Sequence, residues 1–369
     1  MPKLSTHLAR PEIFNLKPYT PGKPIEEVKR ELGLSDVIKM ASNENPLGAS
    51  PLAVQAVREA IDLLHIYPDS NCYYLRQKLA EKFGVTENMI LLGNGSDELL
   101  RLIAETFLRP GDEVVFAMPT FVEYEFTALV MGAKCVAVPL KDDRHDLTAM
   151  LKAVNEATRI VYLCNPNNPT GTYVNKSELD RFVASLPDDV ILIVDEAYGE
   201  YATNEDYPDG LSYVREGRNV IALKTFSKIY GLAALRIGYG LCRTELAALV
   251  QRVSEPFNVN LLAQTAATAA LDDTEHVQRS LANNAEGIQY LTQALDKLGL
   301  PWVPSQTNFL LIDTGRDCRS VFEKLLTKGV IVRTGDVYGY PRHIRVTVGR
   351  PQDNARFVRE LQGILKEPV

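Results

Sequence analysis

Short apolar runs alternate with segments of helical spacing between about residues 49 and 241. Apolar, β-prone runs of strand length occupy residues 190–194, 219–223 and 237–241. Apolar residues recur at helical spacing at 53–64, 73–83 and 96–108. Alternation of this kind is typical of a mainly parallel sheet with helices on both faces. The pattern therefore predicts an α/β fold.

The pattern changes after residue 271. A long amphipathic helix is predicted over residues 274–298, and strand-like runs follow at 309–312, 330–333 and 344–348. Before the alternating region, a Pro/Gly-rich arm at 17–24 leads into a predicted helix at 25–32. The length of 369 residues exceeds that of one typical domain. We therefore predict an N-terminal arm, a large domain and a small C-terminal α/β domain at residues 1–40, 41–272 and 273–369.

The strongest chemical signal is the stretch KTFSKIYGLAALRIGYG at residues 224–240. Thr225, Ser227 and Lys228 follow an apolar strand, and loops on a rigid scaffold often carry chemistry. Arg236 directly precedes the next apolar run, so the chain can bring its guanidinium back to the loop that carries Lys228. A lysine amine forms a Schiff base with an aldehyde, while a guanidinium and two hydroxyls can hold a phosphate. A single lysine is usually a solvated surface residue, so this stretch needs independent support.

The apolar run at 190–194 supplies that support, because it ends in Asp195 and Glu196. A carboxylate at the carboxyl end of a buried strand lies in the ligand crevice of an α/β sheet. Pyridoxal 5'-phosphate carries an aldehyde, a phosphate and a pyridine nitrogen, and an anion beside that nitrogen keeps it protonated. Asp195 suits this role. The alternative is that Asp195 or Glu196 only caps the segment that follows.

A second strand stops in the loop NPNNPTG, whose prolines and glycine fix a turn. Asn168 can present its amide to the phenolate oxygen of the cofactor ring, and Tyr198 its hydroxyl to the same atom. At least two of the three asparagines, Asn165, Asn167 and Asn168, are expected to serve only the turn.

Residues 89–107 predict a strand, a glycine pair and an amphipathic helix. Backbone amides at the start of a helix bind anions without a charged side chain. We assign the phosphate to Ser96 and Asp97, the latter through its backbone alone. The alternative is that either residue simply caps the helix.

Composition argues against several other classes of protein. Forty Lys and Arg face 47 Asp and Glu, for a formal charge of −7, and no basic run interleaved with aromatics suggests nucleic acid. The five cysteines and five histidines are scattered, so we expect free thiols and no metal site. No window approaches the ~20 apolar residues of a membrane helix, and the N-terminus lacks an apolar signal core. We expect a cytoplasmic protein.

Nine motifs occur in the order of a known family. They are NENPLG (43–48), YPD (67–69), GNGSDE (93–98), PTF (119–121), NPNNPTG (165–171), VDEAY (194–198), TFSK (225–228), LRIGY (235–239) and IRVTVG (344–349). On these motifs the chain resembles the fold-type I pyridoxal-phosphate-dependent aminotransferases, most closely the histidinol-phosphate aminotransferase family. The resemblance implies a cofactor cleft between the two domains, with the N-terminal arm packed with the smaller one.

The resemblance also implies roles for individual residues. Lys228 would form the Schiff base, Asp195 would pair with the pyridinium, and Tyr198 would bind the ring oxygen together with Asn168. The first three are the predicted catalytic residues. Phe121 would stack on the ring at a position where many relatives carry tyrosine, and phenylalanine keeps the stacking face. The residues implied to hold the cofactor phosphate are Ser96, Asp97, Thr225, Ser227 and Arg236.

Tyr67 matches a tyrosine that reaches across a dimer interface to the cofactor phosphate of the neighbouring subunit. The resemblance thus implies a homodimer with shared active sites and an inactive monomer. Arg345 would grip the anionic end of the substrate, and Arg333 and Tyr19 would be further partners for a substrate phosphate. Asn43 completes the predicted substrate set. Without the resemblance, Arg333 is better interpreted as a solvated loop arginine.

The implied reaction is reversible transfer of an amino group between L-histidinol phosphate and 2-oxoglutarate. It gives imidazole-acetol phosphate and glutamate, in histidine biosynthesis. An aromatic amino-acid aminotransferase, or an enzyme with both activities, is an alternative, as is a phosphothreonine decarboxylase. A cofactor-binding protein with a decayed site would have lost Lys228, Asp195 or Arg236, and all three are present.

Overall fold

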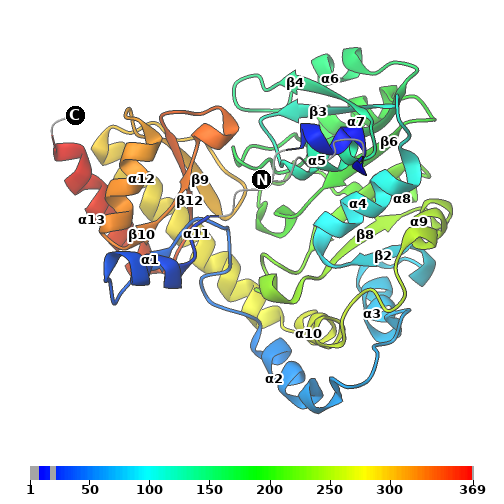
Figure 1. Cartoon of the computed structure of the whole chain (residues 1–369), viewed down its shortest axis with the longest axis horizontal. Coiled ribbons are helices and arrows are strands. Elements are labelled where there is room, and N and C mark those ends of the chain that lie inside the picture. Colours follow the sequence, from blue (N-terminus) through cyan, green and yellow to red (C-terminus); the bar gives the residue numbers. More distant parts are fainter. Residues whose placement is uncertain (1–7, 17–21, 368–369) are drawn as a thin grey trace.

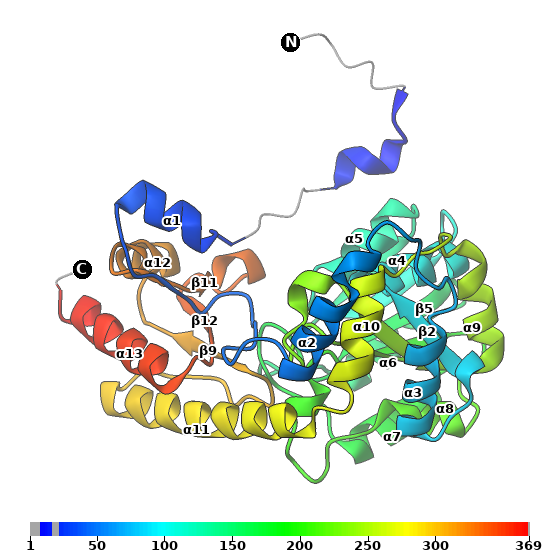
Figure 2. The ribbon, with the colours of Figure 1, turned by 90° about the horizontal axis from the view of Figure 1, so that it is seen from below.

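The computed structural model describes residues 8–16 and 22–367. They form two lobes, with helix α11 (Thr274–Leu298) running from one to the other (Figure 1, Figure 2). The larger lobe contains a seven-stranded sheet in the order β2-β8-β7-β6-β5-β3-β4. The strands are β2 (Ile90–Gly93), β3 (Glu113–Met118), β4 (Lys134–Pro139), β5 (Thr158–Cys164), β6 (Ile191–Asp195), β7 (Val220–Thr225) and β8 (Gly238–Cys242). Strand β8 is antiparallel to both of its neighbours, β2 and β7, and the other neighbouring strands of this sheet are parallel. The predicted α/β fold with a mainly parallel sheet is confirmed.

Both faces of this sheet are covered by apolar side chains. Leu192 and Val194 of β6 belong to one hydrophobic core, while Ile191 and Ile193 belong to the other. Because side chains alternate across a strand, a strand buried on both faces is apolar throughout, as the sequence of β6 is. The flanking helices are α2 (Pro51–Ala60), α3 (Tyr73–Phe83), α4 (Gly95–Phe107), α5 (Glu123–Val130), α6 (Leu147–Ala153), α7 (Lys176–Ser185), α8 (Gly210–Arg215), α9 (Thr244–Val250) and α10 (Leu261–Ala270).

The smaller lobe has a three-stranded antiparallel sheet in the order β11-β12-β9. Its strands are β9 (Phe309–Asp313), β11 (Arg333–Thr334) and β12 (His343–Thr347), and its helices are α11, α12 (Cys318–Thr327) and α13 (Pro351–Lys366). The strand predicted at 330–333 is divided in the structure. Its first half, β10 (Val330–Ile331), pairs instead with β1 (Ile38–Lys39) in a separate parallel ribbon.

The N-terminal residues contact both lobes. Helix α1 (Ile25–Leu32) belongs to the smaller lobe, where Val28 shares a core with Leu326 and Ile331. By contrast, the 3-10 helix at Pro11–Asn15 contacts α5 of the larger lobe. Among the described residues before α2, those at 11–15 thus contact the larger lobe, whereas α1 packs in the smaller one.

In the described part of the chain, no group of three or more His, Cys, Asp or Glu side chains is arranged to hold a metal ion. Of the helices described, none is long and apolar enough to cross a membrane. All five cysteines are free thiols, and all but Cys135 are buried.

A buried ion pair joins the ends of β6 and β7. Lys224 Nζ lies 3.1 Å from Glu196 Oε2, with side-chain exposures of 12% and 1%. Glu196 Oε1 also accepts the backbone N–H of Gly210 at 2.8 Å. Burial opposes the charge of Lys224, but the carboxylates of Glu196 and Glu200 outweigh it and raise its pKa. Glu196 is therefore a structural group, next to Asp195 in the chain.

We expect Glu196→Ala to lower the free energy of unfolding by about 3–5 kcal/mol, because it leaves Lys224 charged, buried and without its partner. Glu275→Ala is the matched control, because its pair with Arg279 is long at 3.9 Å and exposed. That control should change stability by less than about 0.5 kcal/mol. Urea unfolding of the two variants measures both values, and equal losses would show that the buried pair is not important for stability.

Candidate active site

The carboxyl ends of the parallel strands open into a cavity of about 1040 Å³. Most of the residues predicted from the sequence line it, and they come from loops after β2, β3, β5, β6 and β7 and from strands of the smaller lobe. The predicted residues in its wall are Asn43, Ser96, Asp97, Phe121, Asn168, Asp195, Tyr198, Thr225, Ser227, Lys228, Arg236, Arg333 and Arg345. The structure thus brings together side chains that are up to 302 positions apart in the sequence (345 − 43).

Lys228 is a partly buried amine in this wall. Its Nζ lies 3.4 Å from the backbone oxygen of Ser42 and 5.5 Å from the ring centroid of Tyr198. Burial, and next the positive charge of Arg345, lower its pKa to about 8. An amine with such a pKa is neutral in a far larger fraction of molecules near physiological pH than an ordinary lysine, and the neutral form can attack a carbonyl carbon.

Asp195 is 2% exposed and has a donor on each carboxylate oxygen. Oδ1 accepts the backbone N–H of Ala197 at 3.1 Å, and Oδ2 accepts the hydroxyl of Tyr124 at 2.7 Å. Burial raises the pKa of Asp195 to about 6, and the two hydrogen bonds oppose that rise. The turn contact proposed as an alternative is present, but it occupies one oxygen and leaves the other facing α5.

The loop after β5 uses its three asparagines differently. Asn165 bonds both backbone groups of Val174, at 2.8 and 3.2 Å, and Asn167 donates to the Thr170 hydroxyl at 2.9 Å. Asn167 also accepts the Thr120 hydroxyl at 2.7 Å, so these two asparagines fix this loop and join it to the loop after β3. Asn168 instead faces the cavity, where its Oδ1 accepts a hydrogen bond from Arg345.

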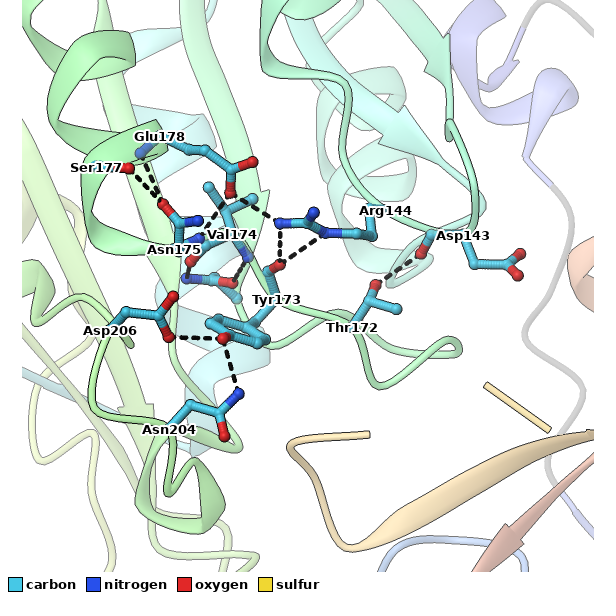
Figure 3. A network of polar contacts seen from close by, with 11 residues as sticks. Asp143, Arg144, Thr172, Tyr173, Val174, Asn175, Ser177, Glu178, Asn204 and Asp206 are labelled. Atoms are coloured by element: carbon cyan, nitrogen blue, oxygen red, sulfur yellow. Dashed lines mark hydrogen bonds and ion pairs between the residues drawn. The ribbon is translucent and has the colours of Figure 1, made fainter. Parts of the chain in front are cut away.

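Polar contacts hold the next stretch of the same loop in place (Figure 3). Arg144 donates to the backbone oxygen of Tyr173 and pairs with Glu178 at 2.8 Å. The Tyr173 hydroxyl donates to Asp206 at 2.6 Å and accepts from Asn204 at 2.7 Å. Since both ends of Tyr173 are bound, the loop that carries Asn168 is anchored on its C-terminal side.

The start of α4 forms a close backbone cradle. A Cβ on Gly95, which has a φ of +82°, would lie 2.6 Å from Arg236 Nη2, and a Cβ on Gly238 would lie 2.6 Å from the backbone nitrogen of Ser96. Only glycine at both places lets the helix start, strand β8 and Arg236 approach so closely. Asn94, rather than Ser96 or Asp97, is the N-cap residue, so the capping alternative is not observed.

These groups fit a phosphate, since the cradle combines backbone amides, the hydroxyls of Thr225 and Ser227, and a guanidinium. Arg236 pairs with the side chain of Asp97 at 2.8 Å, and both side chains are nearly half exposed. Together with the amine of Lys228 and the carboxylate of Asp195, the donor set matches the functional groups of pyridoxal phosphate.

Two arginines of the smaller lobe complete the cavity. Arg333 on β11 and Arg345 on β12 are direct partners in the antiparallel register, so their side chains are on one face. Arg345 is 5% exposed and donates to the backbone oxygen of Ala41 at 2.7 Å. Its Nε is buried without a hydrogen-bond partner in the described part of the chain.

One predicted residue, Tyr67, lies elsewhere. Tyr67 is 79% exposed and stacks on Phe257, with ring centroids 4.7 Å apart, away from the residues that line the cavity. Other exposed apolar residues near it in sequence are Ile61, Leu63, Leu64 and Ile66. Tyr19 falls outside the described residues.

Sequence reasoning missed two tyrosines. Tyr124 contacts Asp195, and Tyr338 contacts Arg345, with 3.3 Å between its hydroxyl and Nη1. The signal for Tyr124 was its place three residues after Phe121, where a helical turn brings two side chains together. Tyr338 had no comparable local signal, because a loop in the smaller lobe brings it to the cavity.

In the cofactor-free protein, we expect an amine-directed reagent to modify Lys228 with a midpoint near pH 8 rather than 10.5. Burial and Arg345 disfavour its charged form, so the neutral amine is present at lower pH. Lys224, whose pKa is raised, is the internal control and should stay unmodified over the same range. Peptide mass spectrometry measures both, and faster labelling of Lys224 would refute the electrostatic interpretation.

Comparison with known proteins identifies the family of this chain. Residues 35–361 match the model for the family "Aminotransferase class I and II". The histidinol-phosphate aminotransferase of Moorella thermoacetica is 56% identical over 96% of this chain and 92% of its own length, and histidinol-phosphate aminotransferase 2 of Carboxydothermus hydrogenoformans is 49% identical over 97% and 99%.

The solved histidinol-phosphate aminotransferase of Sinorhizobium meliloti, in complex with pyridoxal-5'-phosphate, is similar at a TM-score of 0.89. The two are 30% identical, with 96% of this chain and 97% of that chain covered. These findings make the chain a pyridoxal-phosphate-dependent aminotransferase with a fold-type I architecture. It belongs to the aminotransferase class I and II family and, within it, to the histidinol-phosphate aminotransferases.

Proposed function

We propose that this enzyme transfers an amino group reversibly between L-histidinol phosphate and 2-oxoglutarate, in the biosynthesis of histidine. The proposal depends on one observation: Arg333 and Arg345 lie opposite each other on neighbouring strands, and both line the cavity that Lys228 also lines. A phosphate dianion gains more from two neighbouring guanidinium groups than a single carboxylate does. The names of the relatives at 49–56% identity support the same substrate.

Pyridoxal phosphate, when bound, supplies an aldehyde that accepts the amino group and a ring that withdraws electrons. We assign its attachment to Lys228. After the incoming substrate amine displaces Lys228 from the cofactor, the freed Nζ would carry the proton between the substrate and cofactor carbon atoms. The carboxylate of Asp195 would lie beside the ring nitrogen and keep that nitrogen protonated. Asn168 and Tyr198 donate to the ring oxygen, and Asn43 orients the Tyr198 hydroxyl through a hydrogen bond of 2.8 Å.

The remaining assignments concern the phosphate and the ring face. Phe121 covers the face of the ring, as its position in the cavity wall allows. The phosphate is bound by the backbone of Ser96 and Asp97, the hydroxyls of Thr225 and Ser227, and Arg236. A bound phosphate would compete with the Asp97 carboxylate for Arg236.

On the substrate side, we assign the anionic end to Arg345 and Arg333. Asn43 lies at the same wall, with its side chain between Tyr198 and Thr347. Tyr19 stays a predicted substrate residue outside the described chain.

We also propose a cytoplasmic homodimer with shared active sites. The ring of Tyr67 and the apolar residues at 61–66 are exposed in the single chain, which supports a second subunit that covers them. Tyr67 would then reach the cofactor phosphate of the second subunit. Free thiols throughout the chain suit the reducing cytoplasm.

A steady-state substrate panel tests the proposed reaction. We expect a higher kcat/KM for histidinol phosphate than for phenylalanine or tyrosine, and no release of carbon dioxide from phosphothreonine. Arg333→Gln should lower kcat/KM for histidinol phosphate by about ten- to hundredfold, the value of about 1.5–3 kcal/mol for a hydrogen bond to a charged group. The kcat/KM for phenylalanine as a substrate should fall much less.

Arg342→Gln is the matched control, because Arg342 is exposed and pairs with Asp313 outside the cavity wall. It should leave all rates unchanged, and Lys228→Ala should show no turnover of any substrate. A preference for aromatic amino acids that Arg333→Gln does not alter would contradict the proposal.

Mixed dimers test the shared active site. Tyr67→Ala should raise the dissociation constant of pyridoxal phosphate about tenfold, through loss of a hydrogen bond to a charged group. When Lys228→Ala and Tyr67→Ala subunits are mixed, each mixed dimer should contain one complete site, with native cofactor affinity and activity. An active site in the mixed dimer that keeps the weakened cofactor affinity of Tyr67→Ala, or a monomer in sedimentation equilibrium, would refute the arrangement.

A further inference from the structure

Tyr124 contacts the candidate active site directly, although it does not line the cavity. It lies on α5, its side chain is fully buried, and its hydroxyl donates to Oδ2 of Asp195 at 2.7 Å. The other donor to this carboxylate is the backbone of Ala197, at 3.1 Å from Oδ1. Tyr124 is thus the side chain that fixes the second oxygen of Asp195.

The ring of Tyr124 is held between two aromatic neighbours. Tyr162 of β5 stacks on it, with centroids 4.8 Å apart and an interplanar angle of 7°. Phe121 meets it edge to face, at 5.7 Å and 81°. Close packing of this kind holds a ring in one rotamer. The direction of the Tyr124 hydroxyl is therefore set by the core and not by solvent.

We propose that Tyr124 is a positioning residue for the cofactor ring. Its hydroxyl sets the direction of the Asp195 carboxylate, and its ring supports Phe121. Tyr124 would therefore position both Asp195, at the edge of the cofactor ring, and Phe121, on the face of that ring. This inference rests on the proposed assignment of Asp195 and Phe121 to the cofactor.

The hydrogen bond also affects the charge of Asp195. Burial raises the pKa of Asp195 to about 6, and the bond from Tyr124 favours the ionised form. The other titratable groups that interact with Asp195 are Cys164 on β5, Asp97 on α4, the adjacent Glu196, and Tyr207, whose pKa is also raised by burial. Burial raises the pKa of both Tyr124 and Cys164, so neither ionises between pH 5 and 8. Without the Tyr124 hydroxyl, Asp195 takes up a proton at higher pH.

The test compares Tyr124→Phe with Tyr162→Phe. Both changes keep the ring and remove a buried hydroxyl, but the hydroxyl of Tyr162 faces Thr127 instead of Asp195. Equilibrium dialysis of the dimeric enzyme gives the dissociation constant of pyridoxal phosphate between pH 5 and 8. Near-UV circular dichroism of the cofactor-free proteins confirms that both variants keep the core.

Tyr124→Phe should raise the dissociation constant about tenfold at neutral pH, as expected for a lost hydrogen bond to a charged group. The pH at which affinity falls on acidification should move up by about one unit, because a tenfold change in affinity corresponds to one pKa unit. Titration of the cofactor itself is common to all variants and cancels in the comparison. Tyr162→Phe should stay within about twofold of the native protein, with no pH shift.

Asp195→Ala completes a double-mutant cycle. In that background Tyr124→Phe should leave the dissociation constant unchanged within about twofold, since the group it positions is absent. The inference would be overturned if Tyr124→Phe and Tyr162→Phe changed the dissociation constant equally, or if the effect of Tyr124→Phe persisted in the Asp195→Ala background. Either result would leave the proposed cofactor site itself standing. If Asp195→Ala itself binds the cofactor normally, the proposed site falls with it.

Discussion

The active-site geometry depends on the parallel pairing of β5, β6 and β7. In their register Cys164 lies beside Asp195, and Asp195 lies beside Leu223, so the three following loops leave the sheet at one edge. Because successive side chains point to opposite faces, a slip of one residue would turn Asp195 to the other face of the sheet. The apolar cores on both faces oppose such a slip, because each core would then have to pack side chains that fit the other core.

Two lysines four positions apart show how local charge separates structure from chemistry. Lys224 is surrounded by carboxylates and stays charged, so it joins β6 to β7 as part of a buried ion pair. Lys228 lies where burial and Arg345 lower its pKa, which leaves a nucleophilic amine. The same chain segment therefore supplies both a structural cation and a reactive amine, and the difference comes from their neighbours.

The sequence was most informative where local pattern determines structure. The predicted helices at 25–32, 73–83 and 274–298 match α1, α3 and α11 because each ends at a glycine in the left-handed conformation. Contacts made by tertiary pairing could not be predicted in this way. The contact between Tyr124 and Asp195 spans 71 positions, and the position of Arg333 opposite Arg345 follows from strand register. Local pattern alone placed Lys228, Asp195 and Asn168 at strand ends, whereas Phe121, Arg345 and Arg333 were named only because the chain resembles a known family. Tyr67 lies outside the cavity of its own chain, and its proposed role requires a second subunit.

The central claim is that Lys228 Nζ is the atom that holds the cofactor. Borohydride reduction of the cofactor-saturated enzyme makes the link permanent, and peptide mass spectrometry then locates it. The account predicts one modified peptide, with pyridoxal phosphate on Lys228. Modification of Lys224 or another lysine instead, or of none, would contradict it.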